Sequence, residues 1–217
     1  MKVFWVVSFI PNGIFKSHKK EISGGWIESM RKQLCLNPKI ELFLVFKTHL
    51  NQLKCGRCFD TCNYFGIPES NYEERFSQLV FNHSPDVIHI WGTEFEISYQ
   101  TVKVLKGTVF ERRCVTSLQG LVSEICKCFT TGLPSYVINR KTFYEKFRKC
   151  GILDRVNSFK NRSFYELYCI KNSRYVLGRT DWDKNIVYKY SNASKYIKIP
   201  WCSGGRCGRE RGSFPCC

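Results

Sequence analysis

One tight group of cysteines has a spacing that could hold a metal ion. Cys55, Cys58 and Cys62 are separated by two and then three residues, and thiolates at such spacings bind zinc or iron–sulfur clusters. A fourth ligand could come only from the distant end of the chain, at Cys202, Cys207, Cys216 or Cys217. We therefore expect neither a metal nor a cofactor here, and the role of the three cysteines stays open.

A pair of glycines near the start of the chain could approach a phosphate. Gly24 and Gly25 precede a segment with apolar residues at helical spacing, namely Ile27, Met30 and Leu34. Glycine lets the backbone come close to a ligand, and the helix N-terminus offers unpaired N–H groups to an anion. A plain loop-to-helix junction looks the same, so the glycines alone do not establish a phosphate site.

The ionisable residues around positions 86–96 have structural explanations as well as catalytic ones. His89 lies inside an apolar run, which is typical of a hydrogen-bonded core histidine. Glu94 and Glu96 fall in the first turn of a predicted helix, where acids are favoured without any substrate. No Ser-His-Asp or Cys-His pairing can be assigned, so covalent catalysis has no support.

The charge of the chain favours polyanionic partners. Its 217 residues contain 34 Lys and Arg against 18 Asp and Glu, a net charge of +16. Such a chain is attracted to nucleic acid, to an anionic membrane face or to phosphorylated substrates. The basic residues are spread along the whole sequence without a nucleic-acid-binding motif, so we expect no nucleic acid partner. A missing acidic partner domain would also explain the excess.

The cellular location is predicted from what the sequence lacks. No stretch reaches the roughly 18 apolar residues of a membrane span. The first apolar run is too short for a signal peptide and has no small-residue cleavage site. We expect a cytoplasmic protein, with peripheral attachment to the inner membrane face as an option, and mostly reduced thiols among its 13 cysteines.

Strands and helices are predicted to alternate along the chain. Short apolar runs predict strands at 2–9, 40–46, 63–67, 86–91, 113–118, 175–177 and 195–199. Apolar residues at helical spacing predict helices that begin near 26, 70, 93, 141, 153 and 180. Capping boxes are predicted at Ser70–Glu73, Thr93–Glu96 and Thr180–Asp183. Residues 47–61 have no clear period and are expected to form a variable connection.

This alternation predicts an α/β fold with a doubly wound, mainly parallel, Rossmann-like sheet of six or seven strands. Ligands bind such sheets beyond the carboxyl ends of the strands, here in the loops that begin at Pro11, Gly92, Gln119 and Gly178. The domain is expected to span residues 1–199. Residues 200–217 concentrate Gly, Arg and Cys without an apolar period and are expected to be an unstructured or unrelated tail.

Four motifs at these loops resemble a known family. They are residues 23–27 (SGGWI), 85–94 (PDVIHIWGTE), 117–121 (SLQGL) and 177–183 (LGRTDWD). In their order and spacing they resemble the N-terminal half of retaining glycosyltransferases of family four, which have the GT-B fold. The resemblance runs from residue 1 to about residue 199.

The resemblance implies two Rossmann-like domains that face each other across a cleft. The N-terminal domain mostly recognises the acceptor, and the C-terminal domain mostly binds the nucleotide-sugar donor. The chain has no candidate for the paired-glutamate motif or for the diphosphate-binding Arg and Lys of the second domain. It therefore looks like an acceptor-side half, apparently truncated before the donor-binding domain.

The first two motifs contribute five cleft residues by this resemblance. Gly24 and Gly25 would approach the donor diphosphate. Gly92, Thr93 and Glu94 would line the acceptor side.

The last two motifs contribute four more. Gln119 and Gly120 occupy a position where many family members have a histidine before the glycine, and an amide cannot take a proton at neutral pH. No catalytic residue is therefore assigned. Arg179 and Thr180 would face the cleft from the end of a later strand.

The leading hypothesis is the acceptor-binding half of a glycosyltransferase. It would serve transfer from a nucleotide-sugar to a glycan or lipid-linked acceptor in cell-surface polysaccharide synthesis, with retention at the anomeric carbon. Alone we expect it to be inactive. Two alternatives stay open: a basic module that binds polyanions or an anionic membrane surface without catalysis, and a metal or redox protein built on the three cysteines.

Overall fold

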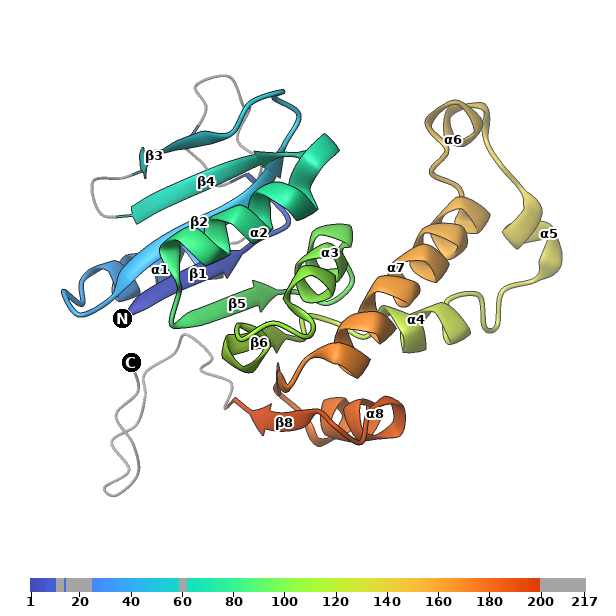
Figure 1. Cartoon of the computed structure of the whole chain (residues 1–217). Helices are drawn as coiled ribbons and strands as arrows, with labels where there is room; N and C mark the ends of the chain where they lie inside the picture. Colours follow the sequence, from blue (N-terminus) through green and yellow to red (C-terminus); the bar gives the residue numbers. More distant parts are fainter. Residues whose placement is uncertain (11–13, 15–24, 59–61, 200–217) are drawn as a thin grey trace.

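A single eight-stranded sheet runs through the computed structural model, which describes residues 1–10, 14, 25–58 and 62–199 (Figure 1). The strands are β1 (Lys2–Val6), β2 (Glu41–Thr48), β3 (Lys54–Cys58), β4 (Cys62–Pro68), β5 (Val87–Trp91), β6 (Cys114–Ser117), β7 (Tyr175–Gly178) and β8 (Lys195–Lys198). They follow the order β3-β4-β2-β1-β5-β6-β7-β8. All neighbours pair in parallel except β3 and β4. The predicted fold class is confirmed.

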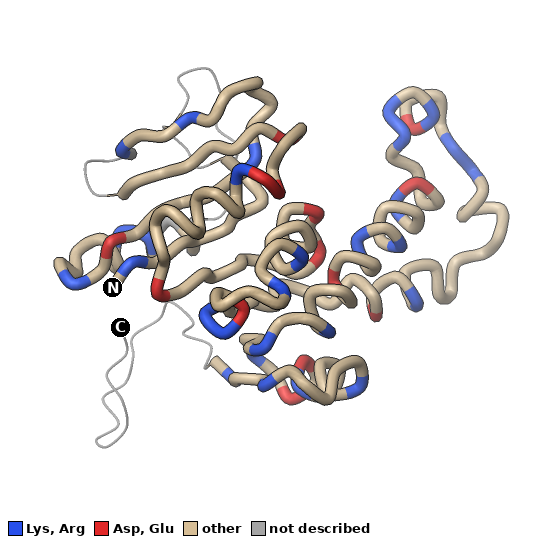
Figure 2. Tube along the Cα trace, in the orientation of Figure 1, with Lys and Arg blue, Asp and Glu red and all other residues tan. Residues whose placement is uncertain are grey.

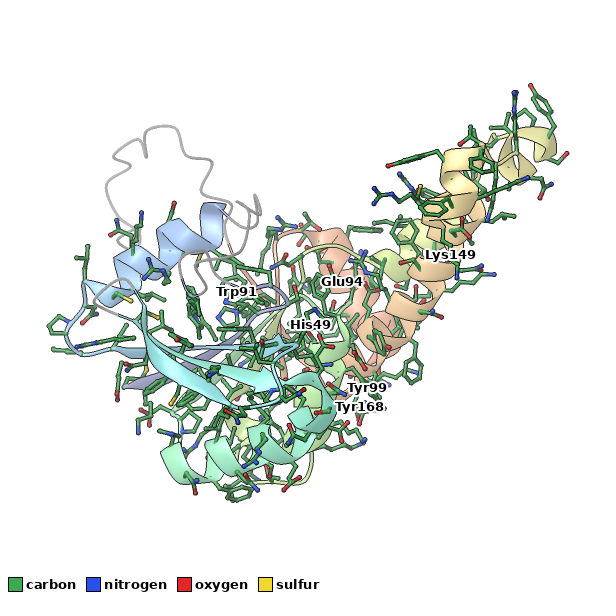
Figure 3. The ribbon with its side chains drawn as sticks, turned by 90° about the horizontal axis from the view of Figure 1, so that it is seen from above. His49, Trp91, Glu94, Tyr99, Lys149 and Tyr168 are labelled. Carbon is green, nitrogen blue, oxygen red and sulfur yellow. The ribbon has the colours of Figure 1, made fainter. Side chains whose placement is uncertain are left out.

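Helices cover both faces of this sheet. They are α1 (Gly25–Cys35), α2 (Tyr72–His83), α3 (Glu96–Leu105), α4 (Val122–Cys128), α5 (Ser135–Asn139), α6 (Phe143–Arg148), α7 (Ile152–Asn172) and α8 (Asp181–Tyr190). Seen from above, α1 and α2 lie on opposite sides of the sheet (Figure 3). The α3 helix packs against α2 and α7, and α7 also packs against α4 and α8.

The central strands show why the sequence predicts them well. In β1, Phe4 and Val6 join the core beneath α2 and α3, whereas Trp5 joins the core beneath α1. Successive side chains of a strand point to opposite faces. A strand covered on both faces therefore has an almost continuous apolar run, as β1 and β2 do.

The β3 strand corrects the prediction for residues 47–61. These residues do not form only a variable connection, because Lys54–Cys58 pairs antiparallel with β4 at the edge of the sheet. The side chains at 54–57 are mostly exposed, so this edge strand needs no apolar pattern to form. Its presence also makes the predicted count of six or seven strands too low.

Two of the three predicted capping boxes are wrong. The α2 helix is capped by Asn71 after a short 3₁₀ turn (Glu69–Asn71), and α3 is capped by Phe95, in both cases without a side-chain bond. Thr93 precedes that cap by two residues and is buried in the loop. The third box is confirmed, since Asp183 N–H donates to Thr180 Oγ1 over 3.0 Å and Thr180 N–H donates to Asp183 Oδ2 over 3.0 Å.

The segment between β6 and β7 is largely helical. The predicted helices near 141–149 and 153–171 correspond to α6 and α7, and residues 121–140, for which no element was predicted, contain α4 and α5. No helix in the described ranges is long and apolar enough to cross a membrane. The predictions for the loop at Pro11 and for the tail at 200–217 concern residues outside these ranges.

Candidate functional site

The carboxyl ends of three adjacent strands, β5, β6 and β7, lie at one edge of the sheet. Gly92 N–H, just after β5, donates to Ser117 O at the end of β6 over 3.0 Å. Leu118 N–H donates to Leu177 O on β7 over 2.8 Å. The loops that follow β5, β6 and β7 therefore lie side by side, at the position where doubly wound sheets bind ligands.

Gly92 makes the tight turn at the start of this edge. Its φ is +87°, and a Cβ there would come within 2.6 Å of the Phe95 ring. Ser98 Oγ donates to the Gly92 carbonyl over 2.6 Å, which ties the turn to the first turns of α3. Glycine is required here by the backbone itself, whether or not a ligand approaches.

Thr93 and Glu94 turn inward from this loop. Thr93 is 0% exposed and Glu94 is 5% exposed. Arg162 Nη2 on α7 donates to Glu94 Oε1 over 3.2 Å, and the guanidinium lies over the Phe95 ring. Figure 3 places Glu94 beside Trp91 along the edge, on the side nearer α7. Glu94 is therefore not the helix first-turn acid that the sequence suggested, a role that only Glu96 has.

Two polar atoms of this pair lack a hydrogen-bond partner. Within the part of the chain that the structure describes, Thr93 Oγ1 and Glu94 Oε2 are buried and unpaired. An unpaired buried polar group costs about 1–3 kcal/mol, so it calls for a physical explanation. Burial raises the pKa of the Glu94 carboxyl above its ordinary value, although backbone N–H groups and Arg162 oppose the rise. The carboxyl is thus shifted towards its protonated form.

Glu166 is a buried acid that the sequence analysis missed. It is 0% exposed. Its Oε2 accepts from Val122 N–H over 2.7 Å, and its Oε1 accepts from Ser123 N–H over 3.1 Å and from Ser123 Oγ. Burial raises its pKa despite these bonds. Its position near the apolar face of the predicted helix at 153–171 could have indicated a buried acid. Its hydrogen-bond partners lie 43 and 44 residues away in the sequence, so local patterns could not reveal them.

Arg179 joins the loops after β6 and β7. Its guanidinium donates to the Gln119 carbonyl over 2.9 Å, and its backbone N–H donates to Asp183 Oδ2 over 2.8 Å. Thr180 uses its hydroxyl to cap α8. A Cβ at Gly120 would meet nothing within 4 Å, so no packing contact explains that glycine. The structure thus places Gln119 next to Arg179, whereas the Thr180 side chain stabilises the N-terminus of α8.

The glycine pair at the first loop adds little to the site. Gly25 begins α1, and Gly24 lies outside the described residues. The predicted approach of both glycines to a diphosphate stays a prediction.

The cysteine cluster shows no convergence of its described thiols. Cys55 is exposed on β3, whereas Cys62 is fully buried on β4. Within the described ranges, no group of three or more His, Cys, Asp or Glu side chains could hold a metal ion. The Cys58 side chain is not among those described, so its role stays open.

His89 is a half-buried histidine of β5 that packs among aromatic side chains, whereas its apolar run indicated a core position. Its Nε2 lies 2.6 Å from Ser117 Oγ, and its ring centroid lies 4.0 Å from that of Trp91. Burial lowers the pKa of this imidazole to about 3. The Ser117–His89 pair faces Trp5 and Trp91 within the sheet, and Ser117 is only 4% exposed. It offers no accessible nucleophile.

We expect His89 to stay neutral when the folded protein is acidified. Because its folded pKa lies below the unfolded value of about 6.5, the unfolded state binds the proton first. His89 therefore lowers the stability of the fold progressively as pH falls from about 6.5 towards 3. Imidazole NMR signals assigned with a His89→Gln variant should show no titration between neutral pH and about pH 4. In urea the same signals should titrate near the ordinary value. Protonation of folded His89 near pH 6 would contradict the lowered pKa.

The sheet and its covering helices define a class of architecture. A mainly parallel, Rossmann-like sheet flanked by helices matches one half of a GT-B glycosyltransferase. The structure is similar to sucrose-phosphate synthase from Thermosynechococcus elongatus, with a TM-score of 0.52 and 12% sequence identity. A second structure of sucrose-phosphate synthase from that organism gives a TM-score of 0.47 and 10% identity, covering 94% of this chain and 90% of that one. No protein-family model and no curated protein matches the sequence.

The chain spans only part of the enzyme in the first match. It covers 92% of this chain but 47% of the sucrose-phosphate synthase chain, so this chain spans about half of that enzyme. At 12% identity the likeness establishes the fold alone.

Proposed function

We propose that this chain is the acceptor-binding half of a glycosyltransferase. The complete enzyme would move a sugar from a nucleotide-sugar to a glycan or lipid-linked acceptor, with retention at the anomeric carbon, in cell-surface polysaccharide synthesis. Membership of family four, and a cytoplasmic site of action at the inner membrane face, belong to the same proposal. The observation that carries it is that Thr93 Oγ1 and Glu94 Oε2 are buried without a hydrogen-bond partner among the described residues. Both atoms lie at the edge of the sheet where folds of this kind bind ligands.

The chemistry of this pair suits a sugar hydroxyl. A hydroxyl group both donates and accepts hydrogen bonds, so it can donate to Glu94 Oε2 and accept from the Thr93 hydroxyl. Arg162 is about one-third exposed and covers the carboxylate. In the proposed complex its side chain turns aside and opens the pair to the acceptor. Gln119 and Arg179, joined at the neighbouring loops, extend the polar edge along which an acceptor would lie.

Thr93→Val should weaken saccharide binding without lowering the stability of the free protein. The variant keeps the shape of the side chain and removes a hydroxyl that has no partner in the described residues. Because an unpaired buried hydroxyl costs stability, its removal should leave the free energy of unfolding unchanged or raise it by up to about 3 kcal/mol, whereas one lost hydrogen bond to a ligand should weaken binding about 5- to 30-fold. Saturation-transfer NMR with a panel of mono- to tetrasaccharides measures the binding, and urea titration measures the stability.

Thr116→Val provides the matched control. Thr116 is equally buried, but its hydroxyl lies 2.8 Å from Ser173 Oγ. Its loss leaves Ser173 with one partner fewer, so we expect a destabilisation of about 1 kcal/mol and unchanged saccharide binding. A panel in which no saccharide binds, or a Thr93→Val protein that binds as tightly as the wild type, would contradict the proposed acceptor site.

A non-catalytic module that binds a polyanionic surface is the second candidate. The specific observation in its favour is a cluster of exposed aromatic and basic side chains on α6.

A further inference from the structure

An arm formed by residues 129–150 projects from the body of the domain. It contains α5 and α6, which extend well beyond the sheet and its covering helices (Figure 1). The arm is anchored at its base, where α5 packs on α7 and Lys141 Nζ lies 2.8 Å from both carboxylate oxygens of Asp154. The α6 helix is positioned by these anchors at the tip of a convex projection.

The tip carries exposed aromatic side chains. Phe143 is 88% exposed and Phe147 is 81% exposed. They are four residues apart on α6 and so lie on the same side of the helix. Tyr144, at 64%, adjoins them, and Tyr136 on α5 is 71% exposed. Leaving a phenylalanine side chain in water is unfavourable, and clusters of exposed apolar side chains mark interaction sites.

The same tip is strongly basic. Residues 140–149 contain five Lys or Arg and one acidic residue, Glu145. Glu145 is occupied within α6, where it accepts from the Thr142 N–H and hydroxyl. No described acidic group forms an ion pair with Arg140, Lys146, Arg148 or Lys149. Figure 2 shows the basic residues gathered around α6 and the segment leading into it, and Figure 3 shows Lys149 on the arm, far from the sheet.

We propose that this arm binds the surface of an anionic phospholipid bilayer. Phe143, Phe147 and Tyr144 enter the boundary between headgroups and acyl chains, while the flanking cations contact lipid phosphates. An apolar helix face bordered by Lys and Arg is the pattern of interfacial helices. The long basic side chains can lie along the apolar face and keep their charges in the headgroup layer.

The shape of the arm favours a bilayer over other polyanions. Single-stranded nucleic acid is bound in grooves whose aromatic walls stack successive bases, whereas these rings protrude from a convex tip. A bilayer accepts a protruding apolar tip without a complementary groove. The inference does not depend on the proposed glycosyltransferase function, although a lipid-linked acceptor would be met at the same surface.

The test is co-sedimentation of the full chain with vesicles. Vesicles of phosphatidylcholine with roughly one-third phosphatidylglycerol should bind the chain, and vesicles of phosphatidylcholine alone should bind it far less. Raising sodium chloride from about 0.1 M to about 1 M should release most of it, because salt screens the attraction. Failure to bind the anionic vesicles, or equal binding to both kinds, would overturn the proposal.

Two sets of variants distinguish binding by the arm from attraction by the net charge of the chain. Lys146→Gln, Arg148→Gln and Lys149→Gln together should weaken partitioning by about 100-fold, at about fivefold per basic residue. The control changes Lys54, Arg57 and Lys195 to Gln. These residues are exposed on β3 and β8, and their substitution removes the same amount of charge. It should weaken partitioning less than about threefold, because these residues lie away from the tip. Equal losses in both sets would show attraction by net charge only and would refute the role of the arm.

The aromatic residues have their own variant. The double variant Phe143→Ala, Phe147→Ala should weaken partitioning about 100-fold or more. The control is Trp182→Ala on α8, which removes an aromatic side chain that is 52% exposed and should change partitioning little. Because all three side chains are exposed, the thermal midpoints should match the wild type. Arm-dependent binding of polyuridine without binding to vesicles would identify the arm as a nucleic-acid surface and refute the proposal. Unchanged vesicle partitioning of the double variant would show that the aromatic side chains do not enter the bilayer, which would also refute it.

Discussion

The purified 217-residue chain should bind saccharides but release no nucleoside diphosphate from nucleotide-sugars. Transfer needs the reacting carbon of the donor held against the acceptor hydroxyl, and such positioning contributes roughly 7–11 kcal/mol to catalysis. The chain aligns with 47% of the sucrose-phosphate synthase chain, and under the proposed function it supplies only one of the two halves that hold donor and acceptor together. Each missing donor of charge stabilisation costs about 10²–10³ in rate, which places turnover below detection.

The measurement is release of nucleoside diphosphate from a panel of nucleotide-sugars, in the presence of each saccharide that binds. A two-domain GT-B transferase assayed in parallel serves as the positive control. Turnover above roughly 1 s⁻¹, within the usual enzyme range, would show that this half suffices for catalysis. Such a result would overturn the division of labour on which the proposed function rests, but it would leave the lipid-binding arm untouched.

Glu166→Ala should be among the most destabilising single substitutions in the chain. Glu166 is completely buried and accepts from Val122 N–H, Ser123 N–H and Ser123 Oγ. The alanine leaves all three donors without this acceptor, at an expected cost of about 2–4 kcal/mol. The raised pKa of Glu166 means that its own burial already carries a cost, so the loss is smaller than the sum of three hydrogen bonds.

Urea unfolding measures this change as a shift in midpoint at constant slope. Glu166→Gln retains one acceptor oxygen and should fall between the wild type and the alanine variant. Glu74→Ala, an exposed glutamate on α2, should stay within about 0.5 kcal/mol of the wild type. If the Glu166→Ala protein unfolded with the same midpoint as the Glu74→Ala protein, α7 would not hold the loop after β6 through this carboxylate.

The site depends on this link between α7 and the sheet edge. Glu166 holds the start of α4, which follows the Gln119–Gly120 loop directly, and Arg162, one turn earlier on the same helix, holds Glu94 after β5. The α7 helix thus fixes two neighbouring loops. Loss of Glu166 should therefore disturb the proposed acceptor edge even where the sheet itself survives.

The order of strands and helices followed from local sequence patterns. The apolar runs at β1, β2 and β5 and the helical spacing in α2, α3 and α7 each involve residues close in the chain. Local periodicity reports which faces are buried, so the mainly parallel sheet could be predicted from it. The β3 strand could not, because an exposed edge strand pairs through its backbone and leaves no apolar pattern.

The position of the candidate site was also within reach of the sequence. Loops after parallel strands meet at one edge, which led to Gly92, Gln119 and Arg179. The need for glycine at residue 92 follows from its positive φ, a local property. The sequence also contains the Thr180–Asp183 box, in which both partners lie within one helical turn.

Only the tertiary structure decided which polar groups are satisfied. Arg162 reaches Glu94 across 68 residues, Arg179 reaches Gln119 across 60, and Glu166 reaches Val122 across 44. Phe143 and Phe147 have the spacing of a core-facing helix, yet they are the most exposed aromatic residues of the arm. Periodicity shows that a helix has an apolar face, but only the packing of distant segments determines whether anything covers it.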